Sequence, residues 1–95
     1  MKVLKQVLGI DVAQKELVVT LGKMYDDFKI ELCSYAVFKN TKKGFLELSQ
    51  WAEKLTDTEI KVRYVMEATG VYHQKFAYYL EEKAEDVSII LPNKI

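Results

Sequence analysis

Cysteine is nearly absent from this sequence of 95 residues, which contains one, Cys33. A single cysteine cannot build an internal disulfide framework or a cysteine-based zinc site. Cys33 lies in an apolar stretch, which favours a small core side chain in a reducing cytosol. Disulfide-held domains and cysteine zinc modules are therefore excluded.

Long apolar runs are also missing. None approaches the ~18–20 residues of a membrane-spanning helix, and no charged-then-apolar leader precedes the first expected strand. We therefore predict a cytoplasmic protein without a membrane partner. Hydrophobic residues make up 49% and charged residues 29% of the chain, which is the balance of a folded domain.

An excess of charge of either sign is absent, because 14 Lys and Arg balance 14 Asp and Glu. A free-standing nucleic-acid binder normally carries enough positive charge to attract phosphates. The balance disfavours that class, but it permits a catalytic segment whose phosphate-binding charge lies mostly elsewhere in a larger protein.

The length leaves room for one small domain, whose stability should be modest unless it dimerises or docks onto further chain. The chain ends shortly after its last expected strand, with no closing helix. We therefore expect residues 1–95 to be the amino-terminal part of a longer protein.

Three strands are expected in the first 40 residues, over residues 3–11, 16–21 and 28–38. The first carries a nearly continuous apolar run, typical of a strand covered on both faces. Residues 22–27 supply a turn, and the alternation of the third strand breaks near Cys33 and Ser34, where a bulge is expected. The short connections predict an antiparallel meander.

The apolar spacing then becomes helical. Asn40 and Thr41 form a helix start signal, and Thr56 to Thr58 end that helix. Thr69 and Gly70 open a second helix, and strands are expected over residues 61–67 and 86–91, the last closed by Pro92. The apolar stripes expected to face the core are Phe45, Leu48, Ala52 and Leu55 in the first helix and Tyr72, Phe76, Tyr79, Leu80 and Ala84 in the second.

This order, β-β-β-α-β-α-β, predicts an α/β fold with a mixed five-stranded sheet, because strand–helix–strand crossovers produce parallel neighbours. Ribonuclease-H-like domains and the lobes of actin-like ATPases have the same order of elements.

Two carboxylates stand in apolar surroundings, Asp11 after the first strand's apolar run and Glu67 at the end of the fourth strand. Burial would be costly for each without a compensating partner. If the two strands are parallel neighbours, both carboxylates lie at the carboxyl edge of the sheet. Such oxygen ligands suit Mg²⁺ or Mn²⁺, although a two-metal nuclease site generally needs three or four carboxylates. The alternatives are a turn or cap role for Asp11 and a helix-dipole role for Glu67.

Two motifs carry a resemblance to a known family. GIDVAQK at residues 9–15 and VMEATGVYH at residues 65–73 look like the amino-terminal part of the DEDD-type insertion-sequence transposases, a family that includes the pilin-gene-inverting recombinases. The stretch from Phe38 to Asn40, Gly44-Phe45 and the later Leu91-Pro92-Asn93 follow in the family's order, so the resemblance covers essentially the whole chain.

The resemblance implies a RuvC-like, ribonuclease-H-like nuclease domain, truncated here at its carboxyl end. It implies that Asp11 and Glu67 are the first two of four catalytic, metal-binding carboxylates, the other two lying beyond residue 95. Mg²⁺ or Mn²⁺ is expected only with those carboxylates present. The implied partners are DNA, a guide RNA and further copies of the protein, and the fragment alone is expected to be inactive.

Four further residues are candidates for nucleic-acid contact. Thr69 at the expected helix start could present backbone N–H groups to a phosphate, although plain capping is the alternative. Lys39, Lys42 and Lys43 form the one basic cluster, which is either a solvated helix start or a contact to the DNA or RNA backbone. The tyrosines near residues 72–79 are expected to pack in the core, except Tyr78.

Two other functions remain open. An actin-like ATPase or sugar-kinase lobe also ends its first strand in Asp, but its phosphate loop needs Gly-Thr next, where this chain has Val12-Ala13. A non-catalytic dimerisation or interaction module that keeps the fold is the second. The prediction is therefore part of a transposase or recombinase that cleaves and exchanges DNA strands.

Overall fold

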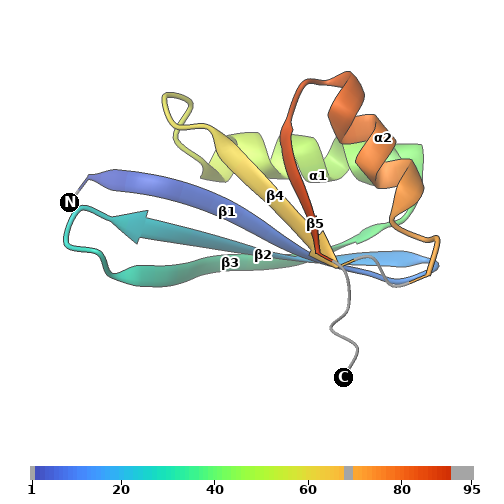
Figure 1. The fold of residues 1–95 in the computed structure, drawn as a ribbon, viewed down its shortest axis with the longest axis horizontal. Coiled ribbons are helices and arrows are strands. Elements are labelled where there is room, and N and C mark those ends of the chain that lie inside the picture. Colours follow the sequence, from blue (N-terminus) through green and yellow to red (C-terminus); the bar gives the residue numbers. More distant parts are fainter. Residues whose placement is uncertain (1, 68–69, 91–95) are drawn as a thin grey trace.

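The computed structural model describes residues 2–67 and 70–90 (Figure 1). These residues form an α/β fold in the predicted order. Its elements are β1 (Val3–Val12), β2 (Glu16–Tyr25), β3 (Ile30–Lys39), α1 (Lys42–Leu55), β4 (Val62–Glu67), α2 (Gln74–Glu82) and β5 (Asp86–Ile90).

The strands form one five-stranded mixed sheet in the order β3-β2-β1-β4-β5. β1, β2 and β3 are an antiparallel meander, whereas β4 pairs parallel to both β1 and β5. These pairings confirm the predicted architecture. In the parallel pair, Ile10 of β1 lies beside Met66 of β4, so the two strands end at the same edge.

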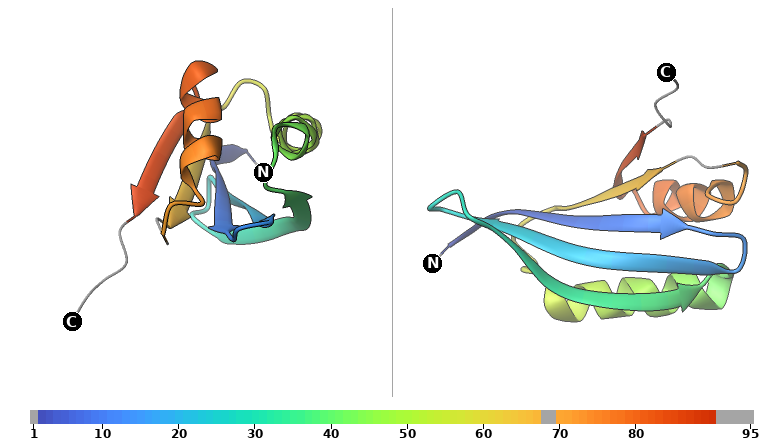
Figure 2. Two further views of the ribbon diagram at one scale, coloured as in Figure 1. Left: turned by 90° about the vertical axis from the view of Figure 1, so that its right-hand side faces the viewer. Right: turned by 90° about the horizontal axis from the view of Figure 1, so that it is seen from below.

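Both helices pack on one face of the sheet, as Figures 1 and 2 show. The core lies between them and the sheet. Alternate residues of β1, Leu8, Ile10 and Val12, are buried there. From the helices come Phe45, Leu48, Ala52, Phe76, Ala77 and Leu80. None of the helices in residues 2–67 and 70–90 combines the length and hydropathy needed to cross a membrane.

The other face of the sheet is open within the described residues (Figure 2, right), so the expectation that β1 is covered on both faces is wrong for this part of the chain. Apolar side chains of β3 stand exposed on it, with Ile30 75% and Leu32 74% accessible. A hollow of about 360 Å³ crosses this face, and its lining includes Val7, Gly9, Gly22, Met24, Ile30 and Leu32.

The β2–β3 hairpin is longer than expected. The stretch from Gly22 to Tyr25, predicted as turn, pairs with β1 and belongs to β2. The predicted bulge is confirmed at Cys33: Leu21 pairs with Ser34 and Gly22 with Leu32, which leaves Cys33 without a partner in the ladder. Cys33 is only partly buried and packs at the margin of the core.

The corner between β3 and α1 is tightly built. Thr41 is the N-cap of α1, and its hydroxyl accepts a hydrogen bond of 3.1 Å from the N–H of Gly44. Gly44 lies against the backbone of Lys39: a Cβ built on Gly44 would stand 1.8 Å from the Lys39 carbonyl oxygen. Only glycine permits this approach.

Gly44→Ala is therefore expected to lower the free energy of unfolding by about 2–3 kcal/mol, because α1 must shift away from β3. Helix propensity alone predicts the opposite sign, a gain of about 1 kcal/mol. Urea unfolding followed by circular dichroism measures the change. Gly9→Ala is the control, since a Cβ there would meet nothing closer than the Thr20 carbonyl oxygen at 4.0 Å. A stabilised Gly44→Ala variant would contradict the account.

The start of α2 differs from the prediction. Gly70 has a φ of 66° and belongs to a turn, and the helix begins at Gln74 after His73, whose side chain makes no capping bond. Tyr72, assigned to the core stripe, is therefore 44% exposed. Ala84, assigned to the end of that stripe, follows the helix with a φ of 56°. Leu91 and Pro92, expected to close the last strand, lie outside the described residues.

Candidate functional site at the carboxyl edge of the sheet

Asp11 and Glu67 are one residue beyond the last parallel pair, Ile10 and Met66, on neighbouring strands. Ile10 and Met66 are buried under the helices. Because side chains alternate along a strand, Asp11 and Glu67 project to the open face at the carboxyl edge. The adjacency expected from the sequence is present.

Both carboxylates are exposed, so the expectation that they occupy costly buried positions is wrong. The residues directly beside them, Ile10, Val12 and Met66, are the ones buried, on the other face of the sheet. Across residues 2–67 and 70–90, neither carboxylate takes part in a side-chain hydrogen bond or an ion pair. They are available to a ligand.

No cluster of three or more His, Cys, Asp or Glu side chains with metal-binding geometry occurs in the described part of the chain. A pair of carboxylates at a sheet edge nevertheless fits Mg²⁺, which usually takes one or two protein carboxylates together with waters and substrate phosphate. The geometry therefore suits part of a magnesium site.

The basic cluster lies at the same edge of the sheet. β3 runs parallel to β1, because both are antiparallel to the strand between them. Lys39 thus ends its strand on the side where Asp11 ends β1, and Lys42 and Lys43 follow in the first turn of α1. All three are exposed. Thr69, the fourth predicted contact, lies outside the described residues.

Sequence reasoning missed Lys15 at this edge. Lys15 stands in the β1–β2 turn, and it lines a hollow of about 460 Å³ together with Gln14, Glu16, Lys39, Asn40 and Thr41. The other side of the hollow is formed by the end of β3. Placing Lys15 beside it from the sequence would have required the antiparallel pairing of Glu16 with Lys39 to be known.

Asn40, predicted only as part of a helix start signal, joins three segments at this edge. Its side-chain nitrogen Nδ2 donates to the carbonyl oxygens of Ala13 at 2.9 Å and Tyr72 at 3.0 Å. Its backbone N–H donates to the carbonyl of Lys15 at 2.9 Å. The Asn40 Oδ1 and the His73 Nδ1 beside Tyr72 are buried atoms without hydrogen-bond partners in the part of the chain that is described.

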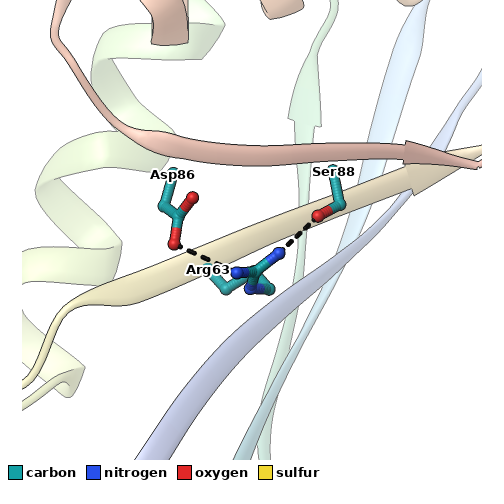
Figure 3. Close-up of polar contacts among 3 residues, drawn as sticks. All are labelled: Arg63, Asp86 and Ser88. Carbon is teal, nitrogen blue, oxygen red and sulfur yellow. Dashed lines mark hydrogen bonds and ion pairs between the residues drawn. The ribbon is translucent and has the colours of Figure 1, made fainter.

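The ion pair of the sheet lies away from the carboxylates. Arg63 of β4 contacts the Asp86 carboxylate at 3.4 Å and donates to the Ser88 hydroxyl at 2.6 Å, so it joins β4 to β5 (Figure 3). Both charged side chains are about half exposed, so the pair adds at most about 1 kcal/mol. It leaves Asp11 and Glu67 unneutralised.

The aromatic residues of α2 divide between core and surface. Phe76 is buried and Tyr79 half-buried, as predicted, and Tyr78 is exposed, also as predicted. Burial and the nearby Glu85 raise the pKa of Tyr64, which packs edge-on against Phe76. These groups lie under the helices, on the face opposite the carboxylates.

No protein-family model and no curated protein sequence matches this chain. Solved structures do. The yeast mitochondrial Holliday junction resolvase aligns over 93% of this chain and 53% of its own, with 16% identity and a TM-score of 0.60. RuvC of T. thermophilus, solved in complex with a Holliday junction substrate, aligns over 92% and 66%, with 15% identity and a TM-score of 0.59.

A Ppx/GppA family member from Aquifex aeolicus aligns over 93% of this chain and 35% of its own, with 13% identity and a TM-score of 0.55. The chain thus spans 35–66% of the length of these three structures. At such identities the likeness shows the fold alone, and that fold is the ribonuclease-H-like, RuvC-like arrangement.

Proposed function

We propose that this chain is the amino-terminal part of the RuvC-like nuclease domain of an insertion-element transposase or recombinase, which cleaves and exchanges DNA strands. The observation that carries the proposal is the placement of Asp11 and Glu67 on adjacent parallel strands, exposed, at one edge and on one face. The resemblance of the motifs around these two residues to the transposase family supplies the finer assignment.

Asp11 and Glu67 would hold Mg²⁺ or Mn²⁺ through their carboxylate oxygens, and two further carboxylates would come from chain beyond Ile95. Bound there by these carboxylates, a divalent ion would supply Lewis-acid polarisation of a phosphate and would offset negative charge during phosphodiester cleavage. The chain's own contribution is to fix two anionic ligands on rigid strand ends, where little reorganisation is needed on binding.

DNA is the proposed substrate, and Lys39, Lys42 and Lys43 are proposed to contact its phosphates at the edge that carries the carboxylates. The RuvC structure with a Holliday junction supports DNA as a partner of this fold. The proposal also includes a guide RNA, a homo-oligomeric assembly and a cytoplasmic location. These three rest on the resemblance of the motifs alone.

The test uses the complete protein that contains this chain and a labelled DNA four-way junction, with Mg²⁺, with Mn²⁺ and with a chelator. Metal-dependent strand cleavage is expected from the complete protein. The 95-residue chain alone is expected to be inactive, because half of the carboxylates are absent. Cleavage that survives chelation, or metal-dependent cleavage by the 95-residue chain, would overturn the proposal.

The lysine cluster gives a separate prediction. Replacing Lys39, Lys42 and Lys43 together by Ala is expected to weaken DNA binding by the complete protein uniformly across sequences. The slope of log affinity against log salt should fall by up to roughly 2.7, about 0.9 for each lost phosphate contact. Fluorescence anisotropy at several salt concentrations measures it. Lys29, Lys54 and Lys61, also exposed but at the opposite edge, form the control triple. Equal slopes in the two variants would contradict the assignment.

An actin-like ATPase lobe is the second candidate, because the Ppx/GppA family member shares the fold at a TM-score of 0.55. The sequence counts against it, since Val12-Ala13 follows Asp11 where a phosphate loop needs Gly-Thr. Binding of ATP by the complete protein, abolished by Asp11→Asn, would favour this candidate over the nuclease.

A further inference from the structure

Asn40 stands where the segments that carry the two carboxylates come together. Ala13 follows Asp11 by two residues, and Tyr72 lies in the turn that connects β4, after Glu67, to α2. The Asn40 Nδ2 donates to both backbone carbonyls, across 27 and 32 residues of sequence. One amide group thus connects the chain after Asp11 to the chain after Glu67.

The two hydrogens of the Asn40 amide nitrogen are both used, so the orientation of the side chain is determined. A flipped amide would aim Oδ1 at two carbonyl oxygens, and no donor would face either of them. The structure instead leaves Oδ1 without a partner in the described part of the chain. The two donated bonds outweigh that loss.

The backbone of Asn40 is held as firmly as its side chain. Its N–H donates to the Lys15 carbonyl, Thr41 caps α1, and Gly44 allows the first turn of α1 to pack against Lys39. Thr41 and Gly44 therefore fix the corner between β3 and α1. The fixed corner holds the Asn40 amide against the two segments.

We propose that Asn40 is a positioning residue, which sets the separation of Asp11 and Glu67 by holding together the segments that follow them. Its effect on metal use rests on the proposed function. Strand pairing aligns β1 and β4 as far as Ile10 and Met66, and beyond that pair the Asn40 bridge is a tie between the two segments. Asp11 and Glu67 remain paired with Val18 and Ile90 on their outer sides, so loss of the bridge would loosen only the spacing between the two strand ends, where two like charges repel.

The first test concerns the bridge itself, in this chain. Asn40→Asp keeps the shape of the side chain but removes both donors, whereas Thr41→Ala removes only the helix cap. Hydrogen exchange is expected to quicken in Asn40→Asp by about tenfold or more in both distant segments, residues 13–15 and 70–73. Thr41→Ala should quicken exchange mainly at the start of α1. Unchanged exchange at either distant segment in Asn40→Asp would overturn the proposed bridge.

The second test concerns metal use in the complete protein. Asn40→Asp is expected to raise the Mg²⁺ concentration for half-maximal junction cleavage by about tenfold, with the rate largely recovered at high Mn²⁺. Thr41→Ala, compared at a temperature where both variants are fully folded, should keep the parental Mg²⁺ requirement. A role confined to stability would change both variants alike.

The outcomes separate the two proposals. A parent protein that shows no metal-dependent cleavage contradicts the proposed function, and hydrogen exchange then decides the bridge alone. A parent that cleaves, together with an Asn40→Asp variant of unchanged Mg²⁺ requirement, overturns the positioning role and leaves the nuclease assignment standing.

Discussion

Asp11→Asn in the complete protein is expected to slow metal-dependent DNA strand cleavage by about a thousandfold. A divalent ion contributes several kcal/mol to stabilising the transition-state charge, and a loss of about 4 kcal/mol corresponds to a thousandfold in rate. Asn retains the shape of the side chain and removes the charge that is proposed to hold the ion. Glu67→Gln should give a loss of similar size for the same reason.

Single-turnover cleavage of a labelled junction at saturating DNA measures this effect. Asp27→Asn is the matched control, since Asp27 is an exposed carboxylate in the hairpin turn at the opposite edge of the sheet. Asp11→Asn and Glu67→Gln should melt at the parental temperature, because neither carboxylate makes a side-chain hydrogen bond or ion pair within residues 2–67 and 70–90. Parental cleavage rates in both variants would favour a non-catalytic interaction module of the same fold.

Phe76→Ala is expected to cost about 3–5 kcal/mol of the free energy of unfolding. Phe76 is fully buried, and its ring lies 5.0 Å from that of Phe45 and 6.4 Å from that of Tyr64. It therefore joins α1, α2 and the sheet in one aromatic cluster. A domain of this size has roughly 5–14 kcal/mol of stability in total, so the loss is a large fraction of it.

Equilibrium urea unfolding measures the change. Phe76→Leu keeps most of the volume and should cost less than about 1.5 kcal/mol, which keeps the test informative if the alanine variant does not fold. Tyr78→Ala is the control on the same helix, since Tyr78 is 64% exposed, and it should change stability by no more than about 0.5 kcal/mol. Equal losses from Phe76→Ala and Tyr78→Ala would contradict the assigned core.

The order of elements was predictable because apolar spacing is a local signal that the packing then uses. Phe45, Leu48 and Ala52 recur at helical spacing and are buried together against the sheet. The bulge was predictable too, since the alternation along β3 breaks where Cys33 drops out of the pairing. In each case the side chains that reveal the element are the ones that stabilise it.

The errors in the predicted element boundaries arose where local sequence preference was overruled by the rest of the fold. Residues 22–27 contain a glycine and two aspartates, which are typical of a turn, but the stretch from Gly22 to Met24 pairs with strands on both sides and stays extended. The start of α2 carries no capping side chain, and the glycine that suggested a start adopts a left-handed turn four residues earlier. Long-range pairing and backbone geometry outweighed local preference at both places.

The candidate site was predictable only in part. Asp11 and Glu67 follow apolar strands, and parallel pairing of those strands brings them to one edge. Their exposure follows from the alternation of side chains along a strand, because the residue that ends an apolar run can face away from the core. Asn40 could not be found in this way, because its partners are 27 and 32 residues distant and are backbone atoms, which leave no signature in the sequence.

The open face of the sheet has a thermodynamic consequence. Gly9 and Gly22 leave room on it that the fold itself does not require, since a Cβ at either position would make only ordinary contacts of 3.7 Å or more. Folding creates this apolar face, so any molecule or segment that covers it binds the folded form alone. Folding and covering are then linked equilibria, and an occupant at a hundred times its dissociation constant would add about 2.7 kcal/mol to the stability of the folded state.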